Sequence, residues 1–538
     1  MHCHVHKAVS LLAACALSVF PATSAFAADE PDFSTKTPIK HVVIIFQENV
    51  SFDHYFATYP NATNPGAEPQ FHGKDDTPRV NNLLAAGLLT ENPNSTQPFR
   101  LDRSQAVTCD QDHNYGDEQK SFDRGLMDKF PEFVGSGTSV SFPCADAGKA
   151  KGLVMGYYDG NTVTAFWNYA QHFAMSDNSF STGFGPSTPG AINLISGNTA
   201  GATLTPFAAD GKTPGSAAGN IAGGLNSGAV IGDPRPEFDD CVSTPVIGTA
   251  KKTRIRMSGK NIGDLLNAKS ITWGWFQGGF GATSRLADGT AVCAGVTSSL
   301  AGPTSDYIPH HEPFMYFQLS ANRHHLPPSS PAAIGKTDQA NHQYDLSAFF
   351  TALSEDKLPA VSFIKAKGAQ DGHAGYSSPL DEQKFVVGLI NLLMQNNEWN
   401  ETAVIIAYDD SDGWYDHQMG PIVMQSDVSD DQLVAPGSCG VTPAGGTAGR
   451  CGYGPRMPLL VISPYAKQNH VDHRVTDQAS ILRFIEANWD LGRIGGGSLD
   501  EKAGTLNGLF DFEEGGKAGK LILDPGTGLP LEEQSSSD

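Results

Sequence analysis

Residues Val42–Phe46 read VVIIF and run straight into Gln47, Glu48 and Asn49. This apolar run is too short for a helix and has no polar alternation, which predicts a strand buried on both faces. In open α/β sheets, ligands bind beyond the carboxyl ends of the strands, and Glu48 and Asn49 stand at such an end. A buried carboxylate without a partner is costly, so Glu48 requires a cation, a proton or a hydrogen-bond donor.

Other segments extend this pattern into an α/β fold. Four further apolar runs predict buried strands at residues 271–276, 360–364, 402–408 and 459–462. Helical periodicity predicts one helix from Glu382 to Asn397, capped by Asp381, and another from Asp477 to Trp489, capped by Thr476. Strand–helix–strand order predicts right-handed crossovers and a parallel sheet. The length allows one large domain with insertions, or two domains.

The amino terminus predicts secretion. His2, His4, His6 and Lys7 precede the apolar stretch 8–20 and the sequence Ala25-Phe26-Ala27, as in a signal peptide cleaved after Ala27. Residues 1–27 are therefore expected to be removed, leaving a periplasmic or secreted protein. A lipoprotein-like box at residues 12–15 is the less favoured alternative, because cleavage there leaves almost no apolar region. No later segment is apolar enough to predict a stable membrane anchor.

The cysteines are consistent with an oxidising compartment. Six remain after Cys3 and Cys15 leave with the signal peptide, and disulfide bonds are the favoured interpretation. Adjacency in the sequence is the only basis for pairing Cys109 with Cys144, Cys241 with Cys293, and Cys439 with Cys451. A zinc site is less expected, because no C-x-x-C pair occurs.

The net charge narrows the choice of partners. A formal charge of −22 argues against nucleic acid as a partner and against charge-driven binding to anionic membranes. An acidic protein that handles an anionic substrate needs a local positive centre. Metal ions and helix amino termini are the usual sources of one.

Three segments are expected to lie outside the regular core. Residues 199–253 are rich in Gly, Ala, Pro and Ser with little periodicity, which predicts a long surface insertion. Residues 425–454 predict a loop tied by Cys439 and Cys451. Residues 512–538 form a Gly- and acid-rich tail, within which Leu521–Leu523 could pack as a short edge element.

A second strand end repeats the opening pattern. The run 402–408 leads into Asp409, Asp410 and then Asp412. Adjacent carboxylates at the end of a buried strand repel each other unless a cation holds them, although an acidic turn is the simpler alternative for this motif alone. Glu48 at a like position on another strand favours a shared metal site, to which Asn49 could add a carbonyl oxygen. Such oxygen ligands suit several divalent ions, so the metal's identity stays open.

A candidate nucleophile follows Gly185 and Pro186. Thr188 before Pro189 predicts the cap and first residue of a helix, which places Ser187 at a helix amino terminus. Backbone N–H groups and the helix dipole favour a phosphate or an alkoxide there. The alternative is a Gly/Pro turn with a capping hydroxyl group.

Histidines supply a third kind of candidate. His310 and His311 lie on a Pro-bounded loop, His373 lies after the run 360–364, and His113 lies between acidic and amide residues. Each could act as a general acid, donate to an anion or bind a metal. Each could equally be an ordinary loop histidine when considered alone.

Together the motifs resemble a known family. QENVSFDHYF after a strand, GPSTPG, HHEPF, DGHAGYS and AYDDSDGWYDH, in this order, resemble the bacterial acid phosphatase and phospholipase C family of the alkaline-phosphatase-like superfamily. The matches extend from about Lys40 to Trp489. The resemblance implies a large α/β fold, with helices on both faces of a mixed, mostly parallel sheet, and a catalytic domain over residues 28–511.

The resemblance also implies roles for the candidate residues. Ser187 would be the transiently phosphorylated nucleophile, next to a divalent metal. The other metal ligands would be Glu48, Asn49, Asp409 and Asp410. The phosphate oxygens would be held by His310, His311 and His373, and His113 would protonate the leaving group.

The leading functional hypothesis is a secreted, metal-dependent acid phosphatase that acts on phosphate monoesters. The alternative is a phospholipase C that cleaves phosphodiester head groups of lipids. Ser187 favours the phosphatase, because phospholipase members of the resembled family often carry Thr there. Ala191 replaces the arginine of the sulfatase motif and weighs against a sulfatase. A non-catalytic phosphate- or metal-binding protein is the third possibility, and the sequence does not predict the oligomeric state.

Overall fold

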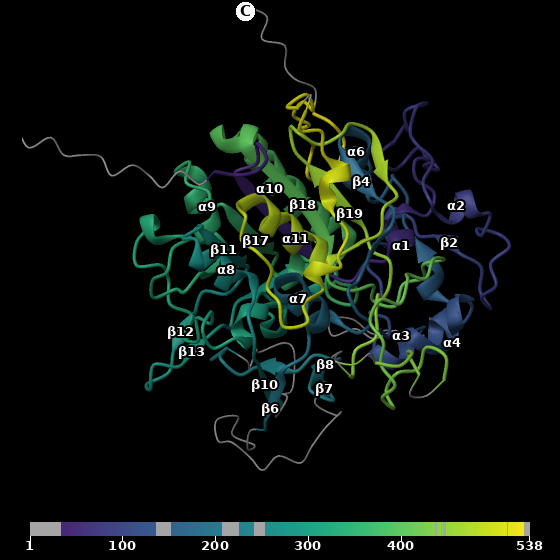
Figure 1. The fold of residues 1–538 in the computed structure, drawn as a ribbon. Helices are drawn as coiled ribbons and strands as arrows, with labels where there is room; N and C mark the ends of the chain where they lie inside the picture. Colours follow the sequence, from purple (N-terminus) through teal and green to yellow (C-terminus); the bar gives the residue numbers. More distant parts are fainter. Residues whose placement is uncertain are drawn as a thin grey trace, which may run out of the picture. The chain divides into compact units, whose positions relative to one another are not determined.

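The apolar run Val42–Phe46 forms the middle of an eight-stranded sheet. In this computed structural model β1 spans His41–Gln47 and lies between β17 (Val361–Lys365) and β18 (Thr402–Tyr408) (Figure 1). The complete strand order is β16 (Gln343–Asp345), β11 (Trp273–Gln277), β17, β1, β18, β19 (Leu459–Ile462), β4 (Ala174–Ser176) and β20 (His470–Asp472). The predicted strands 402–408 and 459–462 have the boundaries expected, and the other two are displaced by one or two residues.

The structure describes residues 34–135, 152–206, 225–241, 253–435, 438–442, 444, 448–513 and 515–531. Residues Thr35–Asp538 form one compact unit, to which all the elements belong. The predicted signal peptide lies outside the described residues. Within them, no helix is both long and apolar enough to cross a membrane.

The sheet is mixed and mostly parallel, as predicted. β1 pairs in parallel with both neighbours, and Ile44 lies opposite Phe363 and Ile405. β19 runs antiparallel to β18 and β4. Val42–Phe46 are completely buried, and because successive side chains of a strand point to opposite faces, both faces of the sheet are covered. The parallel pairing brings the carboxyl ends of β17, β1 and β18 to one edge.

Helices surround this sheet (Figure 1). Helix α7 packs against α11 and α8, and α10 packs against α6. The bounds are α6 (Thr164–His172), α7 (Ser187–Ser196), α8 (Ile262–Ala268), α9 (Leu346–Ser354), α10 (Pro379–Gln395) and α11 (Gln478–Trp489). Shorter helices are α1 (Phe52–Phe56), α2 (Leu83–Ala86), α3 (Tyr115–Phe122) and α4 (Phe130–Phe133).

Both predicted helix caps were wrong. Ser378 caps α10, because its hydroxyl accepts the Asp381 N–H at 3.2 Å and Pro379 occupies the first turn, where its missing N–H costs nothing. Asp477 caps α11 instead of Thr476, in a capping box with Ser480. The apolar periodicity located both helices but carried no information about their first turns.

The remaining strands form small sheets that are separate from the central sheet. Their strands are β2 (Phe99–Arg100), β3 (Gly156–Tyr157), β5 (Ser179–Phe180), β6 (Ala202–Pro206), β7 (Leu225–Asn226), β8 (Ala229–Val230), β9 (Arg235–Pro236), β10 (Thr253–Met257), β12 (Ser284–Arg285), β13 (Ala291–Val292), β14 (Val296–Ser299), β15 (Gly302–Ser305) and β21 (Thr476–Asp477). Within the segment predicted as a surface insertion, Arg235 is 4% exposed and Asp239 is completely buried. The described part of this segment therefore also reaches the interior.

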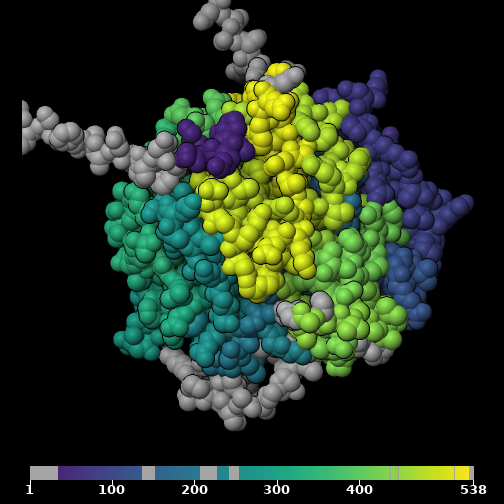
Figure 2. All heavy atoms as spheres, in the orientation of Figure 1, coloured from purple at the N-terminus to yellow at the C-terminus, as the bar shows by residue number. Residues whose placement is uncertain are grey.

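Two predicted disulfides are present, Cys241–Cys293 and Cys439–Cys451. The third predicted pair includes Cys144, which lies outside the described residues. The C-terminal part of the chain, yellow in Figure 2, forms a band across the face in view. Within it, Leu523 is completely buried, and its backbone exchanges two hydrogen bonds with the Asn391 side chain, at 2.8 and 3.2 Å.

Candidate active site

The loops after β1 and β18 meet directly beyond the sheet. The Asp409 N–H donates to the Gln47 carbonyl at 3.2 Å, and the Val50 N–H donates to the Asp410 carbonyl at 3.0 Å. These bonds continue the parallel pairing of the two strands past their ends. They bring Glu48 and Asn49 next to Asp409 and Asp410. We call these four residues the acidic cradle.

Asn49 turns its backbone to join the two loops. Its φ of +60° lies in the left-handed region, which Asn tolerates better than most residues. In this conformation its N–H donates to Asp409 Oδ1 at 3.1 Å, and its side-chain Nδ2 donates to Asp412 Oδ1 at 3.1 Å. The side-chain carbonyl oxygen of Asn49 is then left for another partner.

Ser187 faces the cradle from the first turn of α7. The helix begins at Ser187 with Pro186 as its cap, so the predicted cap Thr188 and first residue Pro189 were each two residues too late. The Ser187 hydroxyl donates to Glu48 Oε2 at 3.1 Å. The Thr188 hydroxyl does not cap the helix but donates to Asp233 Oδ1 at 2.8 Å.

Gly190 lets α7 come this close. A Cβ atom at Gly190 would stand 2.1 Å from the backbone oxygen of Asp409, a distance that no side chain could accept. The first turn of the helix therefore lies directly against the end of β18 because residue 190 has no side chain. This contact explains how a serine on a helix reaches the end of the sheet.

Lys365 is the principal site residue that the sequence analysis missed. It ends β17, is completely buried and forms ion pairs with Glu48 and, at 3.5 Å, with Asp409 Oδ2. Burial alone would lower the pKa of Lys365, but the charges of Glu48 and Asp409 raise it above its usual value. The available signal was a lysine directly after an apolar strand that was predicted to end at Ile364.

The carboxyl groups of the cradle differ in the direction of their pKa shifts. Burial raises the pKa of Asp409 to about 8, and the charge of Glu48 adds to this effect. Burial and the neighbouring Asp409 raise the pKa of Asp410 well above its usual value. Burial opposes ionisation of Glu48 too, but Lys365 lowers its pKa below the usual value. Without an added cation, the cradle therefore favours partial protonation.

The cradle fits a divalent metal ion. Among the described residues, Asn49 Oδ1, Asp409 Oδ2 and Asp410 Oδ2 are buried without a hydrogen-bond partner. Buried oxygens of this kind normally have a partner, and hard oxygen donors suit divalent cations. Asp371, which the sequence analysis did not select, also belongs here, because ligand atoms of Glu48, His311 and Asp371 lie within 4.8 Å of one another.

The three histidines predicted to bind phosphate lie beside Ser187 or beside Glu48. His311 Nδ1 lies 3.0 Å from Glu48 Oε1, and the ring of His310 packs edge-on against that of His311 with centroids 4.5 Å apart. Both belong to a short helical turn, Pro309–His311. His373 Nδ1 lies 2.5 Å from the Ala374 carbonyl, and its ring stacks on Tyr376 at 4.2 Å.

His113 lies on the loop before α3, and the centroid of its ring is 6.2 Å from that of His373. Its Nδ1 lies 2.8 Å from the Gln111 carbonyl and 3.3 Å from Asp412 Oδ1. Burial alone would lower the pKa of His113, but the negative charge of Asp410 and the hydrogen bond to Asp412 raise it well above the usual value. The imidazolium form is therefore favoured in this environment.

A pocket of about 330 Å³ opens above Ser187. Its lining residues are Asp110, Gln111, Asp112, His113, Asn114, Pro186, Ser187, Asp233, His310 and His373. Four predicted site residues thus share one cavity. The remaining five, His311 and the four of the cradle, are at most 3% exposed and lie outside its lining.

Glu118 holds the turn that precedes Ser187. It accepts hydrogen bonds from the Gly185 N–H at 2.8 Å and from the Ser411 hydroxyl at 3.0 Å. It thereby joins the turn before Ser187 to the loop after β18. Burial raises the pKa of Glu118 to about 8. No pattern in the sequence distinguished this glutamate from an ordinary helical one.

The chain is similar in sequence to proteins named as phospholipases C. The non-hemolytic phospholipase C of Pseudomonas aeruginosa is 24% identical over 459 residues, which cover 83% of this chain and 53% of that protein. Phospholipase C A of Mycobacterium tuberculosis is 23% identical over 462 residues, covering 84% of this chain and 73% of that protein. The chain thus spans about half the length of the Pseudomonas relative.

Among solved structures, a protein of the alkaline phosphatase superfamily from Vibrio parahaemolyticus aligns with a TM-score of 0.27 and 9% identity, over 61% of this chain and 62% of that chain. The family assignment does not depend on this alignment. A family model described as the phosphoesterase family matches residues 39–492, which include every predicted site residue. The chain therefore belongs to the phosphoesterase family.

Proposed function

We propose that the protein hydrolyses phosphate ester bonds with Ser187 Oγ as the nucleophile. The supporting observation is the position of Ser187 at the amino terminus of α7, where its hydroxyl is hydrogen-bonded to Glu48 and borders a pocket that contains three histidines. The helix dipole and the backbone N–H groups favour negative charge at this point. This position suits the attack of an oxygen nucleophile on a phosphoryl group.

The chain's own groups account for both halves of the reaction. The Ser187 hydroxyl gives its proton to Glu48 Oε2, its hydrogen-bond acceptor, as Oγ bonds to phosphorus and the bond from phosphorus to the leaving oxygen breaks. The His113 imidazolium gives the leaving oxygen a proton. His310 and His373 donate to the phosphoryl oxygens. Water then attacks the phosphoserine and gives a proton to His113, which is neutral after the first half. The bond from phosphorus to Oγ breaks, Glu48 returns the proton to Ser187 Oγ, and phosphate or a phosphate monoester is released. A divalent cation held by the cradle would supply positive charge beside the phosphoryl group.

The names of the relatives favour phospholipid substrates over the monoesters that the sequence analysis ranked first. In a phospholipase C reaction, the pocket would hold the phosphate and the polar head group, while the diacylglycerol part remains outside. Asp110, Asp112 and Asp233 in the lining suit a cationic head group. Phosphate monoesters remain the second candidate, since Pro186 is the one apolar residue in the lining and the pocket suits small polar esters.

Secretion is part of the proposal. The predicted signal peptide and the two disulfides support a periplasmic or secreted location, because disulfides persist in oxidising compartments. The phosphorylated small molecule or lipid would then be encountered outside the cytoplasm.

Substitution of Ser187 tests the nucleophile. Turnover of phosphatidylcholine vesicles and of p-nitrophenyl phosphate should both fall at least about 1,000-fold in Ser187→Ala, because no other hydroxyl borders the pocket among the described residues. Ser196→Ala is the matched control, since Ser196 lies at the other end of α7. Retained turnover in Ser187→Ala would eliminate this mechanism. An inactive wild-type protein that still binds phosphate would favour the non-catalytic alternative.

The same assay ranks the two substrate classes. Strong cleavage of phosphatidylcholine with weak cleavage of the aryl phosphate is the result expected of a phospholipase C. The reverse ranking would favour the acid phosphatase.

A further inference from the structure

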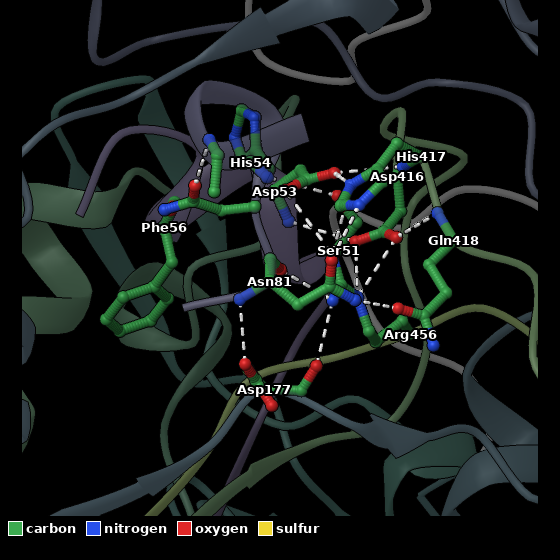
Figure 3. Close-up of polar contacts among 12 residues, drawn as sticks. Ser51, Asp53, His54, Phe56, Asn81, Asp177, Asp416, His417, Gln418 and Arg456 are labelled. Carbon is green, nitrogen blue, oxygen red and sulfur yellow. Dashed lines mark hydrogen bonds and ion pairs between the residues drawn. The ribbon is translucent and has the colours of Figure 1, made fainter. Parts of the chain in front are cut away.

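A second charged cluster lies next to the acidic cradle. Asp53 on α1, Asp416 and His417 on the loop after β18, and Arg456 before β19 converge on one another, as Figure 3 shows. We call these four residues the clamp. They come from the same two loops that carry the cradle, and from the segment that enters the next strand of the sheet.

Ion pairs and a hydrogen bond join the four residues of the clamp to one another. Arg456 Nε lies 3.1 Å from both carboxylate oxygens of Asp416, and Arg456 Nη2 lies 3.4 Å from Asp53 Oδ1. The Asp53 N–H donates to Asp416 Oδ2 at 3.1 Å, and His417 Nδ1 lies 2.6 Å from Asp53 Oδ2. The two loops are therefore joined side chain to side chain, and Arg456 contacts both.

Arg456 is itself held rigidly. It is completely buried, and its Nη1 donates to the backbone carbonyls of Asn81 and Asp177, each at 2.8 Å. Its guanidinium group lies 4.4 Å from the centroid of the Phe52 ring, and its carbonyl accepts the Phe52 N–H at 2.9 Å. A planar guanidinium with its donors fixed in this way sets the positions of the carboxylates that it contacts.

The clamp has the residue types of a metal site but not its charge. Ligand atoms of Asp53, Asp416 and His417 lie within 4.8 Å of one another. Arg456 already neutralises the carboxylates, and the charges of His417 and Arg456 lower the pKa of Asp53 against the effect of burial. Asp53 in turn raises the pKa of His417, although burial opposes this. With its charges balanced internally, the clamp does not need a metal ion.

Short backbone segments connect the clamp to the cradle. The Ser51 hydroxyl donates to the Tyr415 carbonyl at 2.9 Å, between the two clusters. Closer to the sheet, the Val50 N–H donates to the Asp410 carbonyl at 3.0 Å. A change in the separation of Asp53 and Asp416 is therefore transmitted to the separation of the cradle's two halves, because the loops between them are short and bonded to each other.

We propose that Arg456, through Asp53, Asp416 and His417, is a positioning residue that sets the spacing of the metal-binding loops. The inference rests on the proposed function, because it assumes that the cradle binds a divalent cation. Arg456 touches neither the Ser187 side chain nor the residues that line the pocket. Its effect should therefore reach the metal and the rate of the chemical step, and leave substrate binding alone.

A titration of the full-length metal-free protein with Mn²⁺ tests the positioning role. Electron paramagnetic resonance measures the free Mn²⁺ and so gives the Kd. Arg456→Lys keeps the charge but removes the planar fork, and its Kd for Mn²⁺ should rise about 10- to 100-fold. In the Mn²⁺-loaded enzyme kcat should fall while KM stays unchanged. His417→Gln, at the more exposed edge of the clamp, should shift the Kd in the same direction by less, and it carries the test if Arg456→Lys does not fold.

Arg100→Lys is the matched control, because Arg100 also bridges two carboxylates, Glu68 and Asp159, but joins no cradle loop. Its Kd for Mn²⁺ should equal that of the wild type. Wild-type Kd values in both folded clamp variants would overturn the inference, as would a wild-type protein that does not bind Mn²⁺. An active Ser187→Ala variant would instead overturn the proposed nucleophile and leave the effect of the clamp on Mn²⁺ binding standing.

Discussion

The cradle and the clamp are built from the same two loops, yet they treat their carboxylates in opposite ways. In the clamp, Arg456 and His417 face Asp53 and Asp416, so each acid has a basic partner. In the cradle, Lys365 is the one lysine or arginine of the described residues that forms an ion pair with any of the three carboxyl groups. His311 also contacts Glu48, but burial and the charge of Lys365 hold the pKa of its ring well below the usual value.

This difference indicates that the charges of the clamp fix the structure, whereas those of the cradle are available for binding. Buried ion pairs that balance internally fix geometry, and they are tolerated because every group has a partner. A buried cluster that lacks one cation is stable only if it takes up protons or binds a metal ion. We therefore infer that the outer acids of the two loops fix geometry, while the inner acids are left to take up protons or to bind a cation.

The largest effect on this comparison is expected from Lys365→Met. Removing the cation of the cradle leaves buried carboxylates unpaired, which should lower the free energy of unfolding by about 3–5 kcal/mol in the presence of a chelator. Added Mn²⁺ should restore much of this loss, because a bound cation stabilises the folded state. Urea unfolding with and without Mn²⁺ measures both quantities. A variant as stable as the wild type in chelator would show that Lys365 does not compensate the cradle.

A smaller effect on stability is expected from Glu382→Gln. Glu382 is a buried acid whose partners are neutral hydroxyl groups, unlike the acids of the cradle and the clamp. Glu382 accepts hydrogen bonds from the hydroxyls of Tyr55 at 2.7 Å and Tyr408 at 2.8 Å, and burial raises its pKa to about 8. Because its folded-state pKa is raised, the folded protein binds the proton more tightly than the unfolded chain does. The stabilisation is therefore complete in acid and is lost as the pH rises toward 8.

Unfolding measured between roughly pH 5 and 8 should show this contribution as a slope of at most about 1.4 kcal/mol per pH unit. Glu382→Gln should remove that slope, since an amide does not titrate. An unchanged slope in the variant would mean that Glu382 is ionised in the folded protein.

The smallest effect is expected from Ser378→Ala, which removes the cap of α10. The loss of one hydrogen bond to the helix amino terminus should cost about 1 kcal/mol of unfolding free energy. The Kd for Mn²⁺ should stay at the wild-type value, because α10 contributes no residue to the cradle or the clamp. A raised Kd in Ser378→Ala would show that any loss of stability weakens metal binding. A raised Kd in Arg456→Lys would then no longer be evidence for a positioning role.

Much of the fold could be predicted because its central strands are uninterrupted apolar runs. β18 and β19 have the predicted boundaries, since polar or turn-forming residues follow both runs directly. Lys365 shows the limit of this reasoning. Lysine is rarely buried, so a strand prediction based on apolar residues stops at Ile364 and misses the residue that contacts Glu48.

The candidate site was predictable where one motif carried several polar residues. Glu48 with Asn49, and Asp409 with Asp410, follow strands that the sequence already indicated, and the structure places the two pairs together. Asp233 and Glu118 were not predictable, because each lies far along the chain from the residue that it contacts. Their roles depend on tertiary packing and leave no local pattern.

The contact between Gly190 and the Asp409 carbonyl limits which substitutions this chain can accept near the site. Ser187 and the acidic loop come from segments that are distant in the chain, and their alignment depends on the absence of a side chain at residue 190. Substrate preference can change through the pocket lining without disturbing that alignment. Residue 190, where even a methyl group has no room, follows the serine by one helical turn and is not part of that lining.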